Sequence, residues 1–287
     1  MRKFKEFIIE KLVLICGLAS IFFVVLIFLF LLKEGFAVFK TVGPFKFLFG
    51  KSWYPISEPA QLGILPLILG SLLVTVGAAI ISIPIGVGCA IYIAEIAPLK
   101  IKETLKAGIE LLAAIPSVVL GFIGMITLVP LVKTVFHLPT GLTALSGSIM
   151  LAFMAMPTIV SIAEDALYSV PKTYKEGALA LGATHWQTIW RVMLPAASSG
   201  ILAAVMLGIG RVIGETMAVM MITGNAAVMP NSILAPVRTL TATIAAEMGE
   251  AVVGSEHYFA LFAIGIVLFV ISFAINVTAD LFLHKRQ

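Results

Sequence analysis

The sequence contains little charge. Only 12% of its 287 residues are charged, whereas roughly 25% is usual in a soluble domain. Hydrophobic residues make up 60% of the chain, against about 45–50% in such domains. A chain this apolar cannot cover its own surface with polar groups in water. The composition therefore excludes an ordinary water-soluble domain and predicts a protein of the lipid bilayer.

Cysteine and histidine are also scarce, and no catalytic pattern is present. Cys16 and Cys89 lie in apolar stretches without a CxxC pair or a Cys/His cluster, so we expect no metal site and no cofactor. The four histidines fall in predicted loops or at the terminus, and HExxH and GxSxG are absent. An intramembrane enzyme needs a nucleophile with a base, or a metal cluster. We predict no catalytic residues and no enzymatic activity in this chain.

Long apolar runs are abundant, and six of them reach the length of a membrane-spanning helix, about 20 residues. They are Leu12–Leu32, Leu62–Ala94, Leu111–Val132, Leu142–Ala163, Pro195–Met221 and Tyr258–Ala279. Backbone groups in lipid must bond internally, so we expect helices, and no period-two pattern indicates barrel strands. The first run is too long for a cleavable signal peptide and is predicted to be retained. The fold class is therefore all-α, a polytopic bundle of six transmembrane helices.

The positive charges are distributed unevenly between the two sides that these spans define. Twelve lysines and arginines fall on the side of the termini and six on the other. This asymmetry predicts a multi-pass protein of the plasma (inner) membrane with both termini cytoplasmic. The net charge of +4 thus indicates orientation rather than nucleic-acid binding.

The predicted loops divide the chain into two parts. Residues 1–61 hold the N-terminal tail, the first span and an outside loop, in which we expect Trp53-Tyr54-Pro55 to lie at the lipid headgroups. Residues 62–287 form the main transmembrane domain, with a cytoplasmic loop at 165–194. A second outside loop, Thr223–His257, contains a helical stretch at Val237–Val252.

The cytoplasmic loop at 165–194 contains the signals of two short helices. Ser169 is a candidate cap, Pro171 suits a first turn, and Gly182 suits a C-terminal stop. Thr184 then caps a second helix that ends before Pro195. Two helices at a glycine corner would form a rigid projection, but an amphipathic helix with its tryptophans at the headgroups fits the residues equally well.

Two charges fall inside the fifth predicted span. Arg211 and Glu215 are four residues apart, so on one continuous helix they would share a face. Charges in lipid are costly unless paired or hydrated. The two side chains either neutralise each other, or Arg211 faces a path and binds a tetrahedral oxyanion. In the second case Glu215 orients Arg211 or accepts a hydrogen bond from protonated phosphate, which fully ionised sulfate cannot donate.

The cytoplasmic loop resembles the EAA loop of ABC importer permeases. Glu176-Gly177-Ala178 is followed by Gly182 and Leu194-Pro195 at the spacing of that loop, with Gly177 in place of alanine and Val192 in place of isoleucine. The resemblance implies that this projection docks on a cytoplasmic ATPase subunit. It also implies that Glu176, Ala178 and Gly182 form the joint.

Further stretches resemble the PstC-type permeases of phosphate importers. They are Leu65–Leu72, Ile83–Gly86, Glu110–Phe122, Gly210–Val219 and Gly224-Asn225. The resemblance implies a type I ABC importer (MetI-like) fold and a substrate path that includes Arg211, Glu215 and Thr216. It further implies a PstA-type second permease as heterodimer partner, two cytoplasmic ATP-binding subunits, an extracytoplasmic phosphate-binding protein, and phosphate as substrate.

One alternative function stays open, and the EAA-like loop argues against a second. A permease for another oxyanion, such as sulfate, molybdate or tungstate, would carry the same kind of docking loop, and only the path residues would differ. An ion-driven carrier or channel would work without an ATPase, and in such a protein the EAA-like loop would have no function.

Overall fold

The structure, a computed structural model, describes residues 2–284. Helices dominate, and the two strands form one short antiparallel hairpin that pairs Trp53 with Leu62. The elements in chain order are α1 (Arg2–Gly35), α2 (Val38–Thr41), α3 (Pro44–Phe49), β1 (Trp53–Tyr54), β2 (Gln61–Leu62), α4 (Leu65–Ile91), the π-helix η1 (Tyr92–Ile96), α5 (Leu99–Ala114), α6 (Ser117–Val135), α7 (Ala144–Tyr168), α8 (Lys172–Ala180), α9 (His185–Thr188), the π-helix η2 (Ile189–Met193), α10 (Leu194–Ala196), α11 (Ser198–Ile213), α12 (Met217–Ile222), α13 (Leu240–Glu247) and α14 (Glu256–His284). The predicted all-α membrane bundle is confirmed.

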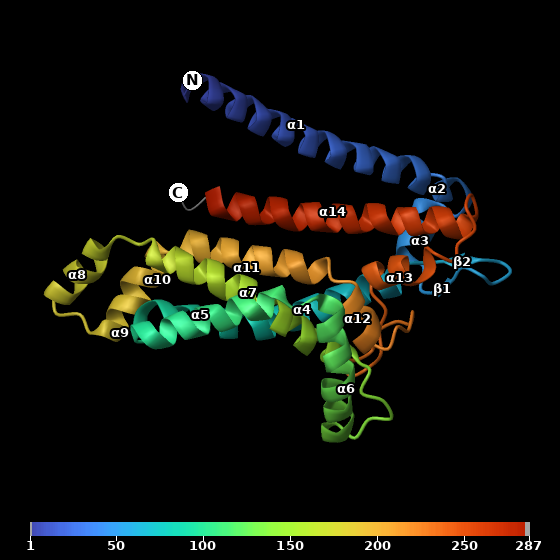
Figure 1. The fold of residues 1–287 in the computed structure, drawn as a ribbon. Coiled ribbons are helices and arrows are strands. Elements are labelled where there is room, and N and C mark those ends of the chain that lie inside the picture. Colours follow the sequence, from blue (N-terminus) through green and yellow to red (C-terminus); the bar gives the residue numbers. More distant parts are fainter. Residues whose placement is uncertain (1, 285–287) are drawn as a thin grey trace.

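The long helices run alongside one another. In Figure 1, α4, α5, α7, α11 and α14 share one direction, and α1 lies outside α14 and diverges from it toward the N-terminus. The described ends of α1 and α14 lie at the same end of the bundle as α8 and α9, which we call the α8 end. The hairpin and α13 lie at the opposite end, the α13 end.

Helix α7 forms the centre of the bundle, and α1 forms its periphery. In the most apolar part of α7, 61% of the residues are buried, whereas in that of α1 none are. Helix α7 packs against α4, α11 and α5, and small residues allow the close approach. At Gly208 of α11, for example, a β-carbon would lie only 2.5 Å from Ile159 Cγ1. Helix α1 contacts α14 through Phe28 on Phe269, whose ring centroids are 4.6 Å apart.

The third predicted span, Leu111–Val132, is wrong as a single helix. Helix α5 ends at Ala114 and α6 begins at Ser117. Pro116 disfavours a helical conformation in the residue before it, and Ile115 is extended with φ −68° and ψ 127°. Beyond this break α6 projects away from the other long helices (Figure 1).

The fifth predicted span, Pro195–Met221, is also broken. The segments His185–Ala196 and Ser198–Ile213 meet at an angle of 71°. Helix α11 then ends at Ile213, and α12 begins only at Met217. The structure therefore contains five helices long and apolar enough to cross a membrane, or six if the bent pair counts as one span, among the described residues.

The α13 end is closed by a cap that the sequence did not predict. Trp53 is 2% exposed and thus covered by protein rather than open to lipid headgroups, whereas Tyr54 beside it is exposed. Its Nε1 donates to both carboxylate oxygens of Glu247, at 3.2 and 3.1 Å. Arg238 and His257 bind the same carboxylate. Of the predicted helical stretch Val237–Val252, α13 covers Leu240–Glu247.

Candidate substrate path and docking projection

Helices α8 and α9 form the predicted projection at the α8 end. Gly182 has φ +85°, a left-handed conformation that favours glycine and turns the chain after α8. Thr184 and Gln187 form a capping box, in which Thr184 Oγ1 accepts from Gln187 N at 3.2 Å and Gln187 Oε1 from Thr184 N at 2.9 Å. The predicted glycine stop and threonine cap are thus confirmed.

The predicted cap at Ser169 is wrong. Ser169 is the residue that follows the last turn of α7. Its hydroxyl donates to Ala166 O in that turn at 2.8 Å and therefore does not cap α8. Pro171 takes the position before α8. The helix therefore begins without a side-chain cap.

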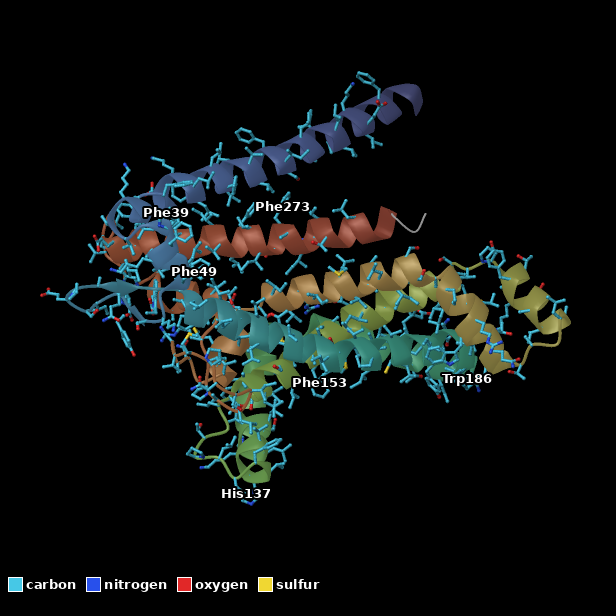
Figure 2. The ribbon with its side chains drawn as sticks, turned by 180° about the vertical axis from the view of Figure 1, so that it is seen from behind. Phe39, Phe49, His137, Phe153, Trp186 and Phe273 are labelled. Carbon is cyan, nitrogen blue, oxygen red and sulfur yellow. The ribbon has the colours of Figure 1, made fainter. Side chains whose placement is uncertain are left out.

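The projection exposes both charged and apolar groups. No residue of α8 is buried. Glu176 and Gly182 are exposed and Ala178 is half-buried, while Leu181 at the tip is 91% exposed. Trp186 and Trp190 are also more than half exposed and meet edge to face. Figure 2 places Trp186 at the α8 end, beyond the long helices. Exposed apolar groups rimmed by charge are typical of a surface that contacts another protein.

Arg211 and Glu215 do not share one helix face, which corrects the sequence expectation. Arg211 lies in the last turn of α11, and Glu215 lies in the break before α12. No ion pair joins them in the described part of the chain. Glu215 Oε1 instead accepts from Ala218 N at 3.2 Å and caps the first turn of α12. Helix α11 ends at Ile213, and the amide of the next residue, Gly214, still bonds back to Gly210 O at 3.3 Å.

Arg211 has a partner that sequence reasoning missed. Its Nη1 donates to Thr158 Oγ1 of α7 at 3.3 Å, and its side chain is otherwise exposed. Thr158 is 53 positions away, so no local pattern predicts the contact. A guanidinium has five N–H donors in a planar fork. Among the described residues, Thr158 is thus the one side chain that accepts a hydrogen bond from Arg211.

Hydrogen bonds fix the break between α11 and α12. Thr216 Oγ1 donates to Gly214 O at 3.2 Å, and Thr241 Oγ1 of α13 donates to Glu215 O at 2.9 Å. The three predicted path residues thus lie in one short segment, with Arg211 at the end of α11 and the half-buried Thr216 in the break itself, directly before α12. Irregular backbone at membrane depth is tolerated where it is buried in protein or lines a water-filled cavity.

Comparisons with known proteins agree with this architecture. A family described as "Binding-protein-dependent transport system inner membrane component" matches residues 82–286. The "Probable ABC transporter permease protein YqgH" of Bacillus subtilis is 44% identical over 90% of this chain and 84% of that protein. The "Phosphate transport system permease protein PstC" of Mesorhizobium japonicum is 37% identical over 84% of this chain and 79% of that protein.

Solved structures share the fold at low sequence identity. A structure of the MetNI methionine ABC transporter in an inward facing conformation aligns with TM-score 0.63 and 18% identity, over 81% of this chain and all of the other. A bacterial alginate ABC transporter in complex with an alginate-bound periplasmic protein aligns with TM-score 0.64 and 16% identity, over 94% of this chain and 93% of the other. Both are ABC transporters, so the predicted permease fold is confirmed.

Proposed function

Because this chain belongs to the family of binding-protein-dependent transport system inner membrane components, we propose that it is a permease subunit of an ATP-driven phosphate importer. The substrate is inferred from the likeness to PstC phosphate permeases, which are 35–37% identical over most of the chain. The chain forms part of the translocation path and docks an ATPase through the α8–α9 projection.

The break between α11 and α12 supplies the substrate contacts in this proposal. Arg211 offers its unused donors to phosphate, because a planar guanidinium matches two oxygens of an oxyanion. Glu215 uses Oε1 to cap α12, so Oε2 accepts a hydrogen bond from protonated phosphate. Thr216 lies next to both and adds a hydroxyl. The relatives named for phosphate favour this substrate over sulfate, molybdate or tungstate.

The projection supplies the contact with the ATPase. Glu176, Ala178 and Gly182 lie on or beside α8, whose side chains are unburied, so they are accessible to a partner. The α8 end then faces the cytoplasm, which places both termini there. This agrees with the excess of lysine and arginine on that side. A second, PstA-type permease completes the path, two ATP-binding subunits bind at the α8 end, and an extracytoplasmic phosphate-binding protein delivers substrate at the α13 end.

Uptake of labelled phosphate and sulfate by the co-expressed complex tests this function. Wild type should import phosphate in an ATP-dependent manner and leave sulfate. Arg211→Gln should reduce phosphate uptake by roughly 10- to 100-fold, the loss expected for a charge-assisted hydrogen bond. Lys133→Gln, at an exposed position near the end of α6, is the control and should import normally.

The outcomes separate the substrate from the site. Sulfate import by the wild type would reassign the substrate. Unchanged phosphate import by Arg211→Gln would leave Arg211 as a structural partner of Thr158 alone. Glu215→Gln tests the acceptor separately, because an unchanged preference for phosphate over sulfate would remove Glu215 from substrate selection.

A further inference from the structure

The docking projection is attached to the bundle in an unusual way. Helix α8 buries none of its residues, so apolar packing does not fix it in place. One side chain reaches back. Lys175 Nζ lies 2.6 Å from Glu95 Oε2, and the Glu95 side chain is only 7% exposed. Lys175 is itself two-thirds covered. The ion pair is thus shielded from solvent, where salt screening is weak.

Glu95 lies at the α8 end of the α4 segment. It is part of η1, the π-helical turn that continues α4 without a break, since Tyr92 has helical φ and ψ. The chain leaves this helix at Ala97, which is extended and precedes Pro98. Glu95 is therefore the point at which α8 contacts the end of the continuous 32-residue segment Leu65–Ile96. The sequence separation is 80 residues.

A groove separates α8 from the bundle around this pair. It encloses about 300 Å³ and is lined on one side by Ala94, Glu95 and Leu167, and on the other by Lys172, Lys175 and Leu179. Around the pair, α8 is therefore not packed closely against the end of α4. The ion pair crosses this groove and connects α8 with the end of α4.

Helix α4 connects the α8 end with the opposite end of the bundle. It packs against α7 and α11, the helices that carry Thr158 and Arg211. Near its start, Ser71 Oγ accepts from Leu240 N of α13 at 2.9 Å. A displacement of η1 therefore acts on a helix that contacts both the candidate path and the α13 end.

A second ion-paired group at the same end has a different geometry. Lys102 and Lys106 of α5 bind Glu164 of α7 at 2.9 and 2.8 Å. None of these residues belongs to the projection. This group holds α5 against α7, and it serves as an internal comparison for the Lys175–Glu95 pair.

We propose that the Lys175–Glu95 pair is the link that transmits movement of the ATPase-docked projection to α4. Both are positioning residues for transport, because neither lies at the candidate path. The inference rests on the proposed function, since it assumes that α8 docks an ATPase. Without the pair, the groove and the corner at Gly182 absorb the movement of α8, and ATP is hydrolysed without transport.

The test measures phosphate imported per ATP hydrolysed by the assembled complex in proteoliposomes. Glu95→Gln and Lys175→Met should retain the ATPase subunits on co-purification and should hydrolyse ATP. Their ratio of phosphate to ATP should fall about tenfold, the change that corresponds to loss of a charge-assisted contact. Lys175→Arg keeps the charge and should retain most of the ratio. The exchanged pair Glu95→Lys with Lys175→Glu should recover part of it, although Glu95→Lys alone should not.

Two controls define the alternatives. Lys106→Gln should leave the ratio unchanged even if it reduces complex stability, because it weakens an ion pair outside the projection. An unchanged ratio in Glu95→Gln and Lys175→Met would overturn the inference, as would loss of the ATPase subunits from both variants. A wild-type complex that hydrolyses ATP but imports no phosphate would instead refute the proposed function. Measuring the wild type first therefore distinguishes the two failures.

Discussion

Glu247 joins three separate segments at the α13 end. Its carboxylate accepts hydrogen bonds from Trp53 Nε1 of the hairpin at 3.2 and 3.1 Å, and binds Arg238 in the loop before α13. It also hydrogen bonds with His257 Nε2 of α14 at 2.9 Å. The side chains of Arg238, Glu247 and His257 are 20%, 16% and 14% exposed. We predict that Glu247→Ala destabilises this end without unfolding the long helices.

The magnitude follows from the partners left behind. Trp53 is almost fully buried, and an indole N–H without an acceptor there costs about 1 kcal/mol. Arg238 loses a charge-assisted contact of roughly 2 kcal/mol, but it keeps its bond from Nε to Asn225 O at 3.0 Å. Since water reaches the rim of the cap, we expect a net loss of about 2 kcal/mol. The midpoint temperature of thermal unfolding should then fall by roughly 4–8 °C for a chain of this size.

The assay heats the detergent-solubilised complex and measures the height of its monodisperse peak in size-exclusion chromatography. The midpoint is the temperature at which half of this peak is lost. Glu250→Ala is the matched control, because Glu250 lines the same 840 Å³ groove as Glu247 and is exposed. That variant should shift the midpoint by no more than about 1 °C. An equally small shift for Glu247→Ala would refute the reasoning, since it would mean that Trp53 and Arg238 find new partners at no cost.

Two further predictions concern the projection. Gly182→Ala should strain the corner by about 1–2 kcal/mol, because φ is +85° there, and should reduce uptake at raised temperature. Gly177→Ala, in the middle of α8 with open space around it, should have the opposite effect on helix stability, by about 0.5–1 kcal/mol; equal effects of the two changes on uptake would contradict the conformational argument. Thr184→Ala removes the capping box at a cost of about 1 kcal/mol. Amide exchange at Gln187 should then accelerate roughly fivefold, and unchanged exchange would show that the cap contributes nothing.

The sequence predicted those features that local chemistry decides. Gly182 stops α8 and Thr184 caps α9, because a left-handed turn and an N-cap depend only on the residues beside them. The apolar runs predicted the long helices in a similar way. In lipid each segment must satisfy its own backbone hydrogen bonds, whatever helix packs beside it. The role of Arg211, Glu215 and Thr216 in a substrate path stays a prediction, since it depends on what these side chains face rather than on their neighbours in the sequence.

The contacts between distant segments could not be predicted in this way. Thr158 lies 53 residues from Arg211, and Glu247 lies 194 residues from Trp53. An aromatic residue in an outside loop suits the headgroups as well as a buried cap. Only the packing of α13 against α14 decides between them for Trp53. Likewise, a spacing of four residues puts Arg211 and Glu215 on one face only in a continuous helix. Helix α11 ends between them, so the expectation fails.

The two broken spans meet through the helices that follow the breaks. Helix α6 follows one break and α12 follows the other, and these two helices pack against each other. A β-carbon at Gly121 of α6 would lie 2.9 Å from Ala218 Cα, and one at Gly124 would lie 2.7 Å from Ile222 Cδ1. Only a residue without a side chain permits so close an approach at these two positions. Pro116 accounts for the first break, and the contact with α6 holds α12 in the position that the second break gives it. The segment that holds Arg211 and Glu215 therefore leads directly into a contact with α6, a part of the chain about 90 positions earlier in the sequence.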